Sequence, residues 1–526
     1  MMGRRAEVSA GPDVWTNCRE LIPAGSVFAF LAEHREELFP ASMFADMYPS
    51  ANGRPSVPPQ ILAVATVLQV LENLSDHDAV AALRCDLRWK AACGLGLNDP
   101  GFDPSLFIYF RRRLSVSADR DRVFARVREV IDATGLLKGK RRRALDSTVF
   151  EDAVATQDTV TQLVAAIRRV IREVPGARQV AERHCRAHDY ADPGKPRIAW
   201  DDAGARAVLV DALVTDALML LGHLPEAELG PAAADAVGLL ALVAGQDVEL
   251  AENSDGRDGR WRIAKGTAPD RMISTVDPQA RHIHKTNANY RGGFKGHVAV
   301  EPETGIVTAV EMRPGSGAEN HEGAVATDLL AGEDGPRVVL GDSAYGGGEA
   351  RADLVAAGHD PVVKPPPLRP AIAGGFDLDD FAVDTAAGEV TCPAGHTVPL
   401  SAPGGRFQQR RAVFADLCRG CPLRERCTNA KAGKIVTIRP HHDRQVAARH
   451  QATTDPDWQD EYRRWRPMVE RGIAWLTRGS RRLRYRGVVK NDAWLHSRAA
   501  AVNLRTLINL GLDHADGTWT LRMTAR

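Results

Sequence analysis

The spacing of apolar residues changes several times along the chain, and each change predicts a different kind of element. Up to about residue 140 the apolar residues are spaced as in short helices, and Gln60–Leu74 is apolar enough for a buried helix. Ser75–Asp78 is typical of a helix cap and predicts a second helix to about Trp89. Residues 1–140 are therefore expected to form an all-helical domain, either a DNA-binding module of the helix-turn-helix type or a plain bundle.

At Arg143–Phe150 the pattern changes to the alternation of a strand, with Asp146 in its middle. Helical spacing returns at Val160–Val174, and Ala/Leu-rich helical patterns continue to about Val248. A strand followed by a long helical insertion is therefore expected.

Strands return in the second half of the chain. His297–Glu301 and Gly305–Met312 alternate and predict a hairpin. A helix is expected next, followed by the strand Arg337–Leu340, a second helix and the strand Pro361–Lys364. Asp342 comes directly after the third of these strands.

Composition and charge narrow the possible functions. A chain of 526 residues exceeds one hydrophobic core, and no apolar tract is long enough to span a bilayer, which favours a cytoplasmic protein. The net charge is only +1, yet residues 111–143 hold 12 Lys/Arg against 4 Asp/Glu, and residues 461–526 hold 14 against 5. These two basic blocks fit either contact with nucleic acid or solvated helix faces.

Three acids stand out by position. Asp146 lies mid-strand, Asp342 follows a strand, and Glu470 lies in the first turn of a helix expected at Pro467–Leu476. Carboxylates on rigid neighbouring elements can hold the two divalent cations used in phosphodiester chemistry, although each acid also has an ordinary structural explanation. The order of these elements is the layout of RNase H-like nuclease and transposase cores.

Seven segments carry a resemblance to a known family. They are R-P-S-V-P-P-Q-I-L (54–62), L-S-D-H-D-A-V-A-A-L-R (74–84), G-F-D-P-S-L-F (101–107), L-D-S-T-V-F (145–150), V-D-P-Q-A-R (276–281) with G-F-K-G-H-V-A-V-E (293–301), and G-D-S-A-Y-G (341–346). Together they resemble the N-terminal helical domain and the first two acid blocks of the bacterial insertion-sequence transposases of the DDE class.

The third acid matches that family only in part. Many relatives carry Tyr, two residues, Arg, three residues, Glu, six residues, Lys. Arg466 and Glu470 keep the Arg-to-Glu spacing, but Arg463 stands at the Tyr position and Thr477 at the Lys position. Glu470 is therefore expected to be the third acid, with Glu461 as its competitor.

The resemblance implies an α/β multidomain protein. An RNase H-like mixed sheet core is expected from residues 141–150, 276–365 and 461–512. A helical insertion (151–275) and a cysteine-bearing insertion (366–460) would interrupt it, after the N-terminal all-helical domain.

The resemblance also implies the chemistry. With two Mg²⁺ (or Mn²⁺) ions held by Asp146, Asp342 and Glu470, such an enzyme cleaves double-stranded DNA at the terminal inverted repeats of its element. The freed 3′-hydroxyl then attacks target DNA, in a complex that needs at least a homodimer, in the cytoplasm at the bacterial nucleoid. A non-catalytic DNA-binding derivative and a nuclease that cuts without joining are the alternatives.

Basic residues near these segments are candidates for contacts with DNA phosphates. They are Arg466, Arg478, Arg481, Arg482, Arg484, Lys285 and Lys295. For the two lysines, ordinary solvation is an equally good explanation.

Four of the eight cysteines lie within 36 residues: Cys392, Cys418, Cys421 and Cys427. A CxxC pair with outlying cysteines has the spacing of a small structural zinc site, with His396 as a possible substitute ligand. The alternative is a set of reduced cysteines without metal.

Overall fold

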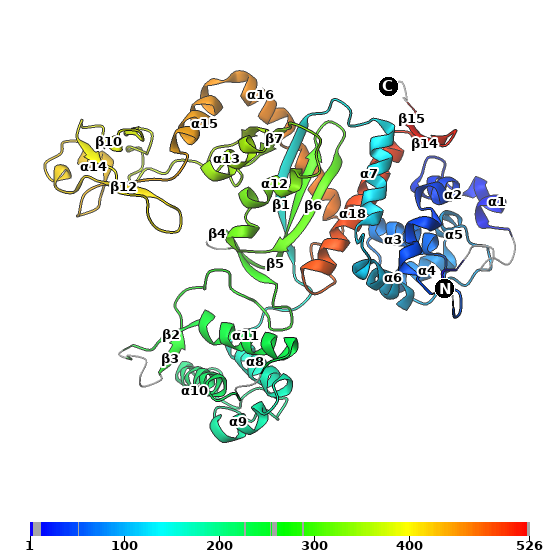
Figure 1. The fold of residues 1–526 in the computed structure, drawn as a ribbon, viewed down its shortest axis with the longest axis horizontal. Helices are drawn as coiled ribbons and strands as arrows, with labels where there is room; N and C mark the ends of the chain where they lie inside the picture. Colours follow the sequence, from blue (N-terminus) through cyan, green and yellow to red (C-terminus); the bar gives the residue numbers. More distant parts are fainter. Residues whose placement is uncertain are drawn as a thin grey trace.

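A mixed sheet lies at the centre of the computed structural model, and three lobes surround it (Figure 1). The structure describes residues 1–3, 12–50, 52–225, 228–252, 254, 260–286 and 289–522. Among these residues no helix is long and apolar enough to cross a lipid bilayer.

The central sheet has six strands. They are β1 (Arg142–Glu151), β4 (Arg281–Thr286), β5 (Asn289–Glu301), β6 (Ile306–Pro314), β7 (Val338–Gly341) and β8 (Asp360–Val363). Strand β5 pairs antiparallel with β1, β4 and β6, whereas β1, β7 and β8 run parallel in that order. The predicted hairpin, β5 and β6, is confirmed, as are the predicted strands at β1, β7 and β8. Strand β4 was not predicted.

Helices cover both faces of this sheet. They are α12 (Glu322–Leu330), which the short helix η4 (Ala318–Asn320) precedes, and α13 (Gly348–Ala356) on one face, and α17 (Met468–Leu476) and α18 (Val488–Asn509) on the other. Leu145 packs in the cluster of α12 and α13, and Ala144 in that of α17 and α18. Because side chains alternate along a strand, Asp146 lies on the α17 side and Ser147 on the α12 side.

The N-terminal lobe is helical, as predicted. It contains α1 (Val14–Cys18), η2 (Arg19–Leu21), α2 (Val27–Leu38), η3 (Ala41–Met47), α3 (Pro59–Glu72), α4 (Asp76–Cys85), α5 (Leu87–Cys93), α6 (Ser105–Val116) and α7 (Arg122–Thr134). The prediction of one helix from Ser75 to Trp89 is wrong. Asp86 has extended backbone and accepts a hydrogen bond from the Arg88 N–H, so it ends α4 and caps α5.

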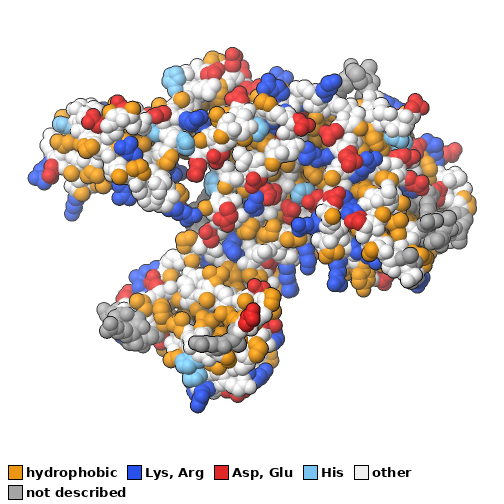
Figure 2. Space-filling view, viewed as in Figure 1, with side chains coloured by type: hydrophobic (Ala, Val, Ile, Leu, Met, Phe, Trp, Pro, Cys, Tyr) orange, Lys and Arg blue, Asp and Glu red, His pale blue; other side chains and the backbone are white. Residues whose placement is uncertain are grey.

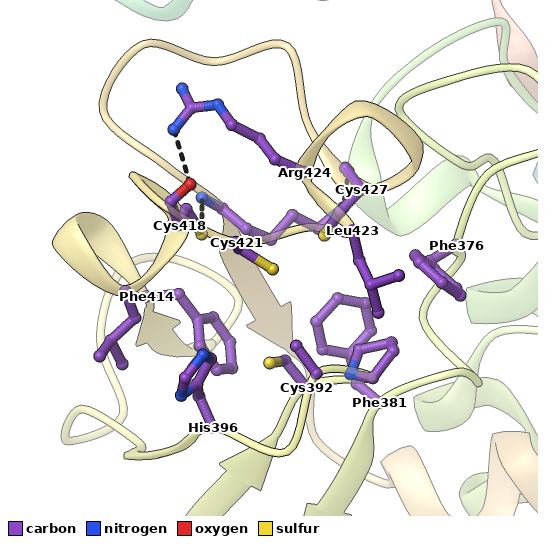
Figure 3. Close-up of a pocket in the computed structure, with 14 residues that line it drawn as sticks. Phe376, Phe381, Cys392, His396, Phe414, Cys418, Cys421, Leu423, Arg424 and Cys427 are labelled. Atoms are coloured by element: carbon purple, nitrogen blue, oxygen red, sulfur yellow. Dashed lines mark hydrogen bonds between the residues drawn. The ribbon is translucent and has the colours of Figure 1, made fainter.

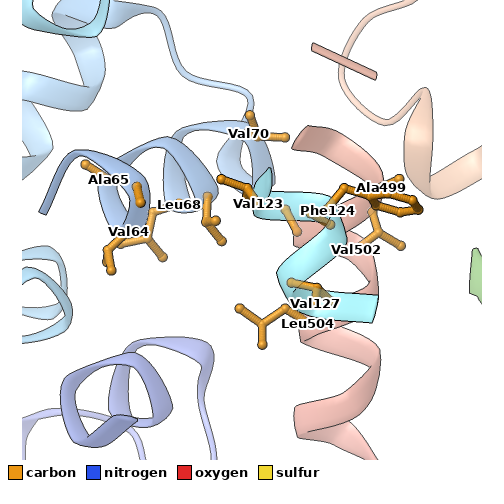
Figure 4. Packing of buried hydrophobic residues seen from close by; sticks show 14 of the residues in the cluster. Val64, Ala65, Leu68, Val70, Val123, Phe124, Val127, Ala499, Val502 and Leu504 are labelled. Carbon is orange, nitrogen blue, oxygen red and sulfur yellow. The ribbon is translucent and has the colours of Figure 1, made fainter. Parts of the chain in front are cut away.

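One hydrophobic cluster joins the N-terminal helices to the sheet. Val64 of α3, Val127 of α7 and Leu504 of α18 are each fully buried in it, and α18 packs against both α3 and α7 (Figure 4). The same cluster continues to Ala144 and Val298 of the sheet. The N-terminal lobe and the sheet therefore share one core through α18.

The helical insertion separates β1 from β4 and has its own core. It contains α8 (Thr159–Glu173), α9 (Ala177–His184), α10 (Ala203–Gly222), α11 (Pro231–Gln246), and the hairpin of β2 (Val248–Leu250) and β3 (Trp261–Ile263).

The cysteine-bearing lobe follows β8 and is built of short elements around a small separate core. They are β9 (Ala382–Asp384), β10 (Glu389–Thr391), β11 (Thr397–Pro399), β12 (Arg410–Val413), η5 (Ala415–Cys418), α14 (Arg424–Cys427) and β13 (Ile435–Ile438). Helices α15 (His442–Thr454) and α16 (Pro456–Trp465) return the chain to the sheet, and the hairpin of β14 (Leu512–Ala515) and β15 (Thr518–Leu521) follows α18.

Candidate functional site

Two of the three predicted acids are held by the register of the sheet. Ala144 of β1 is paired with Leu340 of the parallel strand β7. Asp146 and Asp342 each come two residues later, so both side chains emerge at the same level, on the same face of neighbouring strands. Backbone N–H groups fix one oxygen of each: that of Ser147 donates to Asp146 Oδ1 at 2.7 Å, and that of Ala344 to Asp342 Oδ1 at 2.9 Å.

The third acid reaches the same place from α17. Glu470 lies in the first turn of this helix, which packs on β1 and β5. Helix α17 begins directly after Pro467, close to the predicted start. The structure thus brings Asp146, Asp342 and Glu470 to one side of the sheet.

Arg466, between α16 and α17, links all three acids. Its Nη2 lies 2.8 Å from Asp146 Oδ2 and 3.7 Å from Asp342 Oδ2, and its Nη1 lies 2.7 Å from Glu470 Oε1. The arginine side chain is 10% exposed and that of Glu470 is 66% exposed. One nearly buried guanidinium therefore sits among carboxylates that open toward solvent.

Burial sets the protonation chemistry of this site. Loss of solvation raises the pKa of Asp146, and the nearby charges of Asp342 and Glu470 add to this, so that Arg466 compensates only in part. Burial acts to lower the pKa of Arg466, but the surrounding acids outweigh it and raise it. The positive charge of Arg466 thus favours the ionised form of Asp146, against the loss of solvation.

Tyr345 is a site residue that sequence reasoning missed. Its side chain is fully buried, and its pKa lies well above the ordinary value because of burial and the charges of Glu322, Asp146 and Asp342. Among the described residues neither its hydroxyl nor the Nε of Arg466 has a hydrogen-bond partner. The available signal was its position, three residues after Asp342.

A second polar cluster lies on the opposite face of β1. The Ser147 hydroxyl donates to Glu322 Oε1 at 2.7 Å, and Lys295 Nζ lies 2.9 Å from the same oxygen. Burial acts to raise the pKa of Glu322, but Lys295 and Ser147 outweigh it and lower it to about 2. Lys295, expected at a DNA phosphate, is 14% exposed and holds this carboxylate.

The arginines predicted to contact DNA lie largely between α17 and α18. Arg481 donates to the Thr148 hydroxyl, Arg482 to the Ala153 carbonyl, and Arg484 to the Asn73 carbonyl. The guanidinium of Arg478 lies 4.9 Å from the centre of the Trp475 ring. These residues fasten the segment to β1 and to the end of α3. The side chain of Lys285 lies outside the described residues.

The four clustered cysteines line one cavity in their lobe (Figure 3). Cys392, Cys418, Cys421 and Cys427 surround it together with His396, against aromatic walls that include Phe381 and Phe414. Burial raises the pKa of the Cys427 thiol, and the other three cysteines contribute to the increase. No three of these ligand atoms lie within 4.8 Å of one another in the described part of the chain.

One group outside the predicted sites does meet that distance. Asp121, Asp492 and His496 meet where α7 begins against α18. Burial acts to lower the pKa of His496, but the two carboxylates raise it to about 9. Its Nδ1 lies 3.8 Å from Asp121 Oδ1 and 3.4 Å from Asp492 Oδ2, so the ring forms an ion-paired contact between the start of α7 and α18.

Comparison with known families gave two matches. The model described as "Transposase domain (DUF772)" matches residues 16–113, which span the N-terminal helices from α1 to α6. The model described as "Transposase DDE domain" matches residues 391–508, which include the four clustered cysteines, Arg466 and Glu470. Comparisons with curated proteins and with solved structures gave no match.

Proposed function

Since the chain belongs to the bacterial insertion-sequence transposases of the DDE class, we propose that it cleaves DNA at the ends of its element and joins those ends to target DNA. The observation that carries this proposal is the convergence of Asp146, Asp342 and Glu470 on Arg466. Two of these acids lie outside the matched residues, so their meeting is independent support.

We further propose an RNase H-like catalytic core. Its support is the sheet order, in which antiparallel β6, β5 and β1 are continued by parallel β7 and β8. The core would comprise residues 141–150, 276–365 and 461–512, with the insertions 151–275 and 366–460. Residues 1–140 would bind DNA from a lobe that shares the core of the sheet.

The three acids fit a pair of Mg²⁺ or Mn²⁺ ions because they offer hard oxygen ligands from three rigid elements. When bound, such ions activate the attacking oxygen and stabilise the leaving oxygen of a phosphodiester. The chain itself would align these ligands. Asp146 and Asp342 lie at the same level of neighbouring parallel strands, and Glu470 reaches them from helix α17, which packs on that face of the sheet. Arg466 would then orient a phosphate through paired N–H groups.

The substrate would be double-stranded DNA, with two element ends held by a homodimer or larger assembly. Lys and Arg side chains project along the lower edge of the molecule beneath the N-terminal helices, in keeping with a long phosphate contact (Figure 2).

Cleavage and joining of DNA taken from both sides of the gene test this function. Asp342→Ala should abolish Mg²⁺- or Mn²⁺-dependent activity, whereas Asp353→Ala, an exposed acid on α13, should not. Cutting without joining would indicate a nuclease. Binding without cutting by the wild type would indicate a non-catalytic derivative. Equal activity of Asp342→Ala and the wild type would refute the site.

The cysteine lobe is proposed to hold a structural zinc through Cys392, Cys418, Cys421 and Cys427. Four cysteine side chains lining one cavity match the preferences of this ion, and four protein ligands leave no open position for catalysis. Metal analysis should find about one zinc per chain. Cys421→Ser should lose it, while Cys185→Ser, in the helical insertion, should retain it.

A further inference from the structure

The position of Arg466 has a consequence for metal binding, and this inference rests on the proposed function. Each of the three acids forms an ion pair with this one guanidinium. In the described part of the chain, no other ion pair of Asp146, Asp342 or Glu470 is found. The arginine is thus their common counter-ion.

A divalent ion would need oxygens that Arg466 now uses. The Oδ2 atoms of Asp146 and Asp342 both face its Nη2, while their Oδ1 atoms accept backbone N–H groups. A bound Mg²⁺ or Mn²⁺ at these oxygens would lie within a few ångströms of the positive charge of Arg466, and the two would repel each other.

The guanidinium is also incompletely bonded where it lies. Its Nε is buried without a partner among the described residues, which is an uncommon and costly state for an N–H donor. A DNA phosphate could accept two N–H groups side by side from the same guanidinium. The neighbouring Glu470 is largely exposed, so a phosphate can approach from that side.

We propose that Arg466 is a resident counter-ion that leaves Asp146 and Asp342 when a DNA phosphate binds it, so that DNA and the divalent ion bind cooperatively. Without DNA the arginine offsets part of the negative charge of the acids and weakens metal binding. With DNA the same arginine holds the phosphate beside the metal ligands. The protein is thereby protected from assembling an active metal site away from its substrate.

The experiment measures Mn²⁺ affinity of the full chain by electron paramagnetic resonance of free Mn²⁺. It is run without DNA and with linear duplex cut from the DNA on both sides of the gene. The wild type should bind Mn²⁺ about tenfold more tightly with DNA than without, a factor within the usual range of coupling between sites. Arg466→Ala should bind Mn²⁺ more tightly than the wild type without DNA and gain little from DNA.

Three further variants separate the possible outcomes. Arg463→Ala removes an exposed arginine one turn earlier and should behave as the wild type. Asp146→Asn and Asp342→Asn should each weaken Mn²⁺ binding; if neither does, the proposed metal site itself fails. If both do and Arg466→Ala binds Mn²⁺ no more tightly than the wild type, the counter-ion proposal alone is overturned.

Arg466→Lys keeps the experiment decisive if the alanine variant does not fold. A lysine keeps one positive charge but cannot span three carboxylates, so its Mn²⁺ affinity without DNA should exceed that of the wild type. An affinity equal to or below the wild-type value would overturn the proposal.

Discussion

Asp146 is expected to destabilise the folded chain while serving the site. Burial raises its pKa, so the ionised form is less favourable in the folded protein than in the unfolded one. Asp146→Asn removes this cost and leaves Arg466 paired with Glu470. The free energy of unfolding at pH 7 should rise by about 0.5–2 kcal/mol, as in other sites where activity opposes stability.

Urea denaturation measures this effect. The difference between Asp146→Asn and the wild type should narrow as the pH falls toward 3.8, where the unfolded carboxyl also takes up its proton. Asp342→Asn should have a smaller effect because that side chain is 43% exposed. A loss of stability in Asp146→Asn would contradict the prediction.

Glu322 is expected to have the opposite effect on stability. Its folded pKa of about 2 lies below the ordinary 4.5, so its ionised form stabilises the folded chain above pH 4.5, and this contribution is lost as the pH falls from 4.5 to 2. Glu322→Gln would leave the Lys295 ammonium without its carboxylate in a largely buried place. The free energy of unfolding at pH 7 should fall by about 3–5 kcal/mol.

The matched control for this variant is Glu349→Gln, an exposed residue on α13. It should change the urea midpoint little at any pH. If Glu322→Gln were equally harmless, the buried ion pair would contribute nothing to the fold.

The loop between β7 and α13 depends on one glycine for its shape. A Cβ on Gly346 would lie 2.2 Å from the Lys364 carbonyl oxygen at the end of β8, whereas one on Gly347 would meet nothing within 4 Å. Gly346→Ala should therefore push the loop away from β8 and displace Asp342. We expect a loss of about 1–3 kcal/mol in unfolding free energy and a loss of activity.

Gly347→Ala is the paired test, since its φ of −60° suits any residue. It should keep activity and gain about 0.4–1 kcal/mol from a less flexible unfolded chain. Thermal melting of both variants, alongside the cleavage assay, measures the contrast. Equal stability of the two variants would show that the close approach to Lys364 is not needed.

The elements with a clear period could be predicted from sequence. β1, the β5–β6 hairpin and α8 were found because their apolar residues repeat with period 2 or 3.6 over many positions. β4 was missed because R-H-I-H-K-T has a single apolar residue, and its strand form depends on pairing with β5. The break at Asp86 was missed because a helix pattern continues across it.

The candidate site also has features that could be predicted from the sequence and features that could not. The three acids could be found because each sits at a marked position in its element. The central place of Arg466 and the burial of Tyr345 and Glu322 could not, because they arise where segments more than a hundred residues apart meet. Sequence spacing suggested a phosphate contact for Arg466, whereas its ion pairs are visible only in three dimensions.

At the scale of the whole molecule, the division of the described residues into separate hydrophobic clusters determines which elements can unfold together. α18 joins the N-terminal helices to one face of the sheet, while the helical insertion and the cysteine lobe each have a separate core. Because the N-terminal lobe shares its core with the sheet, it cannot loosen without disturbing the three acids. The insertion, in contrast, can open on its own.

Two leucine-to-alanine variants test this division. Leu504 of α18 and Leu213 of α10 are both fully buried, each in a different core. Each substitution should lower the free energy of unfolding of the part of the chain built on that core by about 2–5 kcal/mol. In hydrogen exchange read by mass spectrometry, Leu504→Ala should lower protection in α3 and β1 together, because one cluster supports both. Leu213→Ala should lower the protection from exchange in helices α8 to α11 and leave that of β1 unchanged.

If Leu504→Ala loosened the N-terminal helices while β1 and β5 stayed protected, the lobe would have to be regarded as an independent domain, attached to the sheet only through α18.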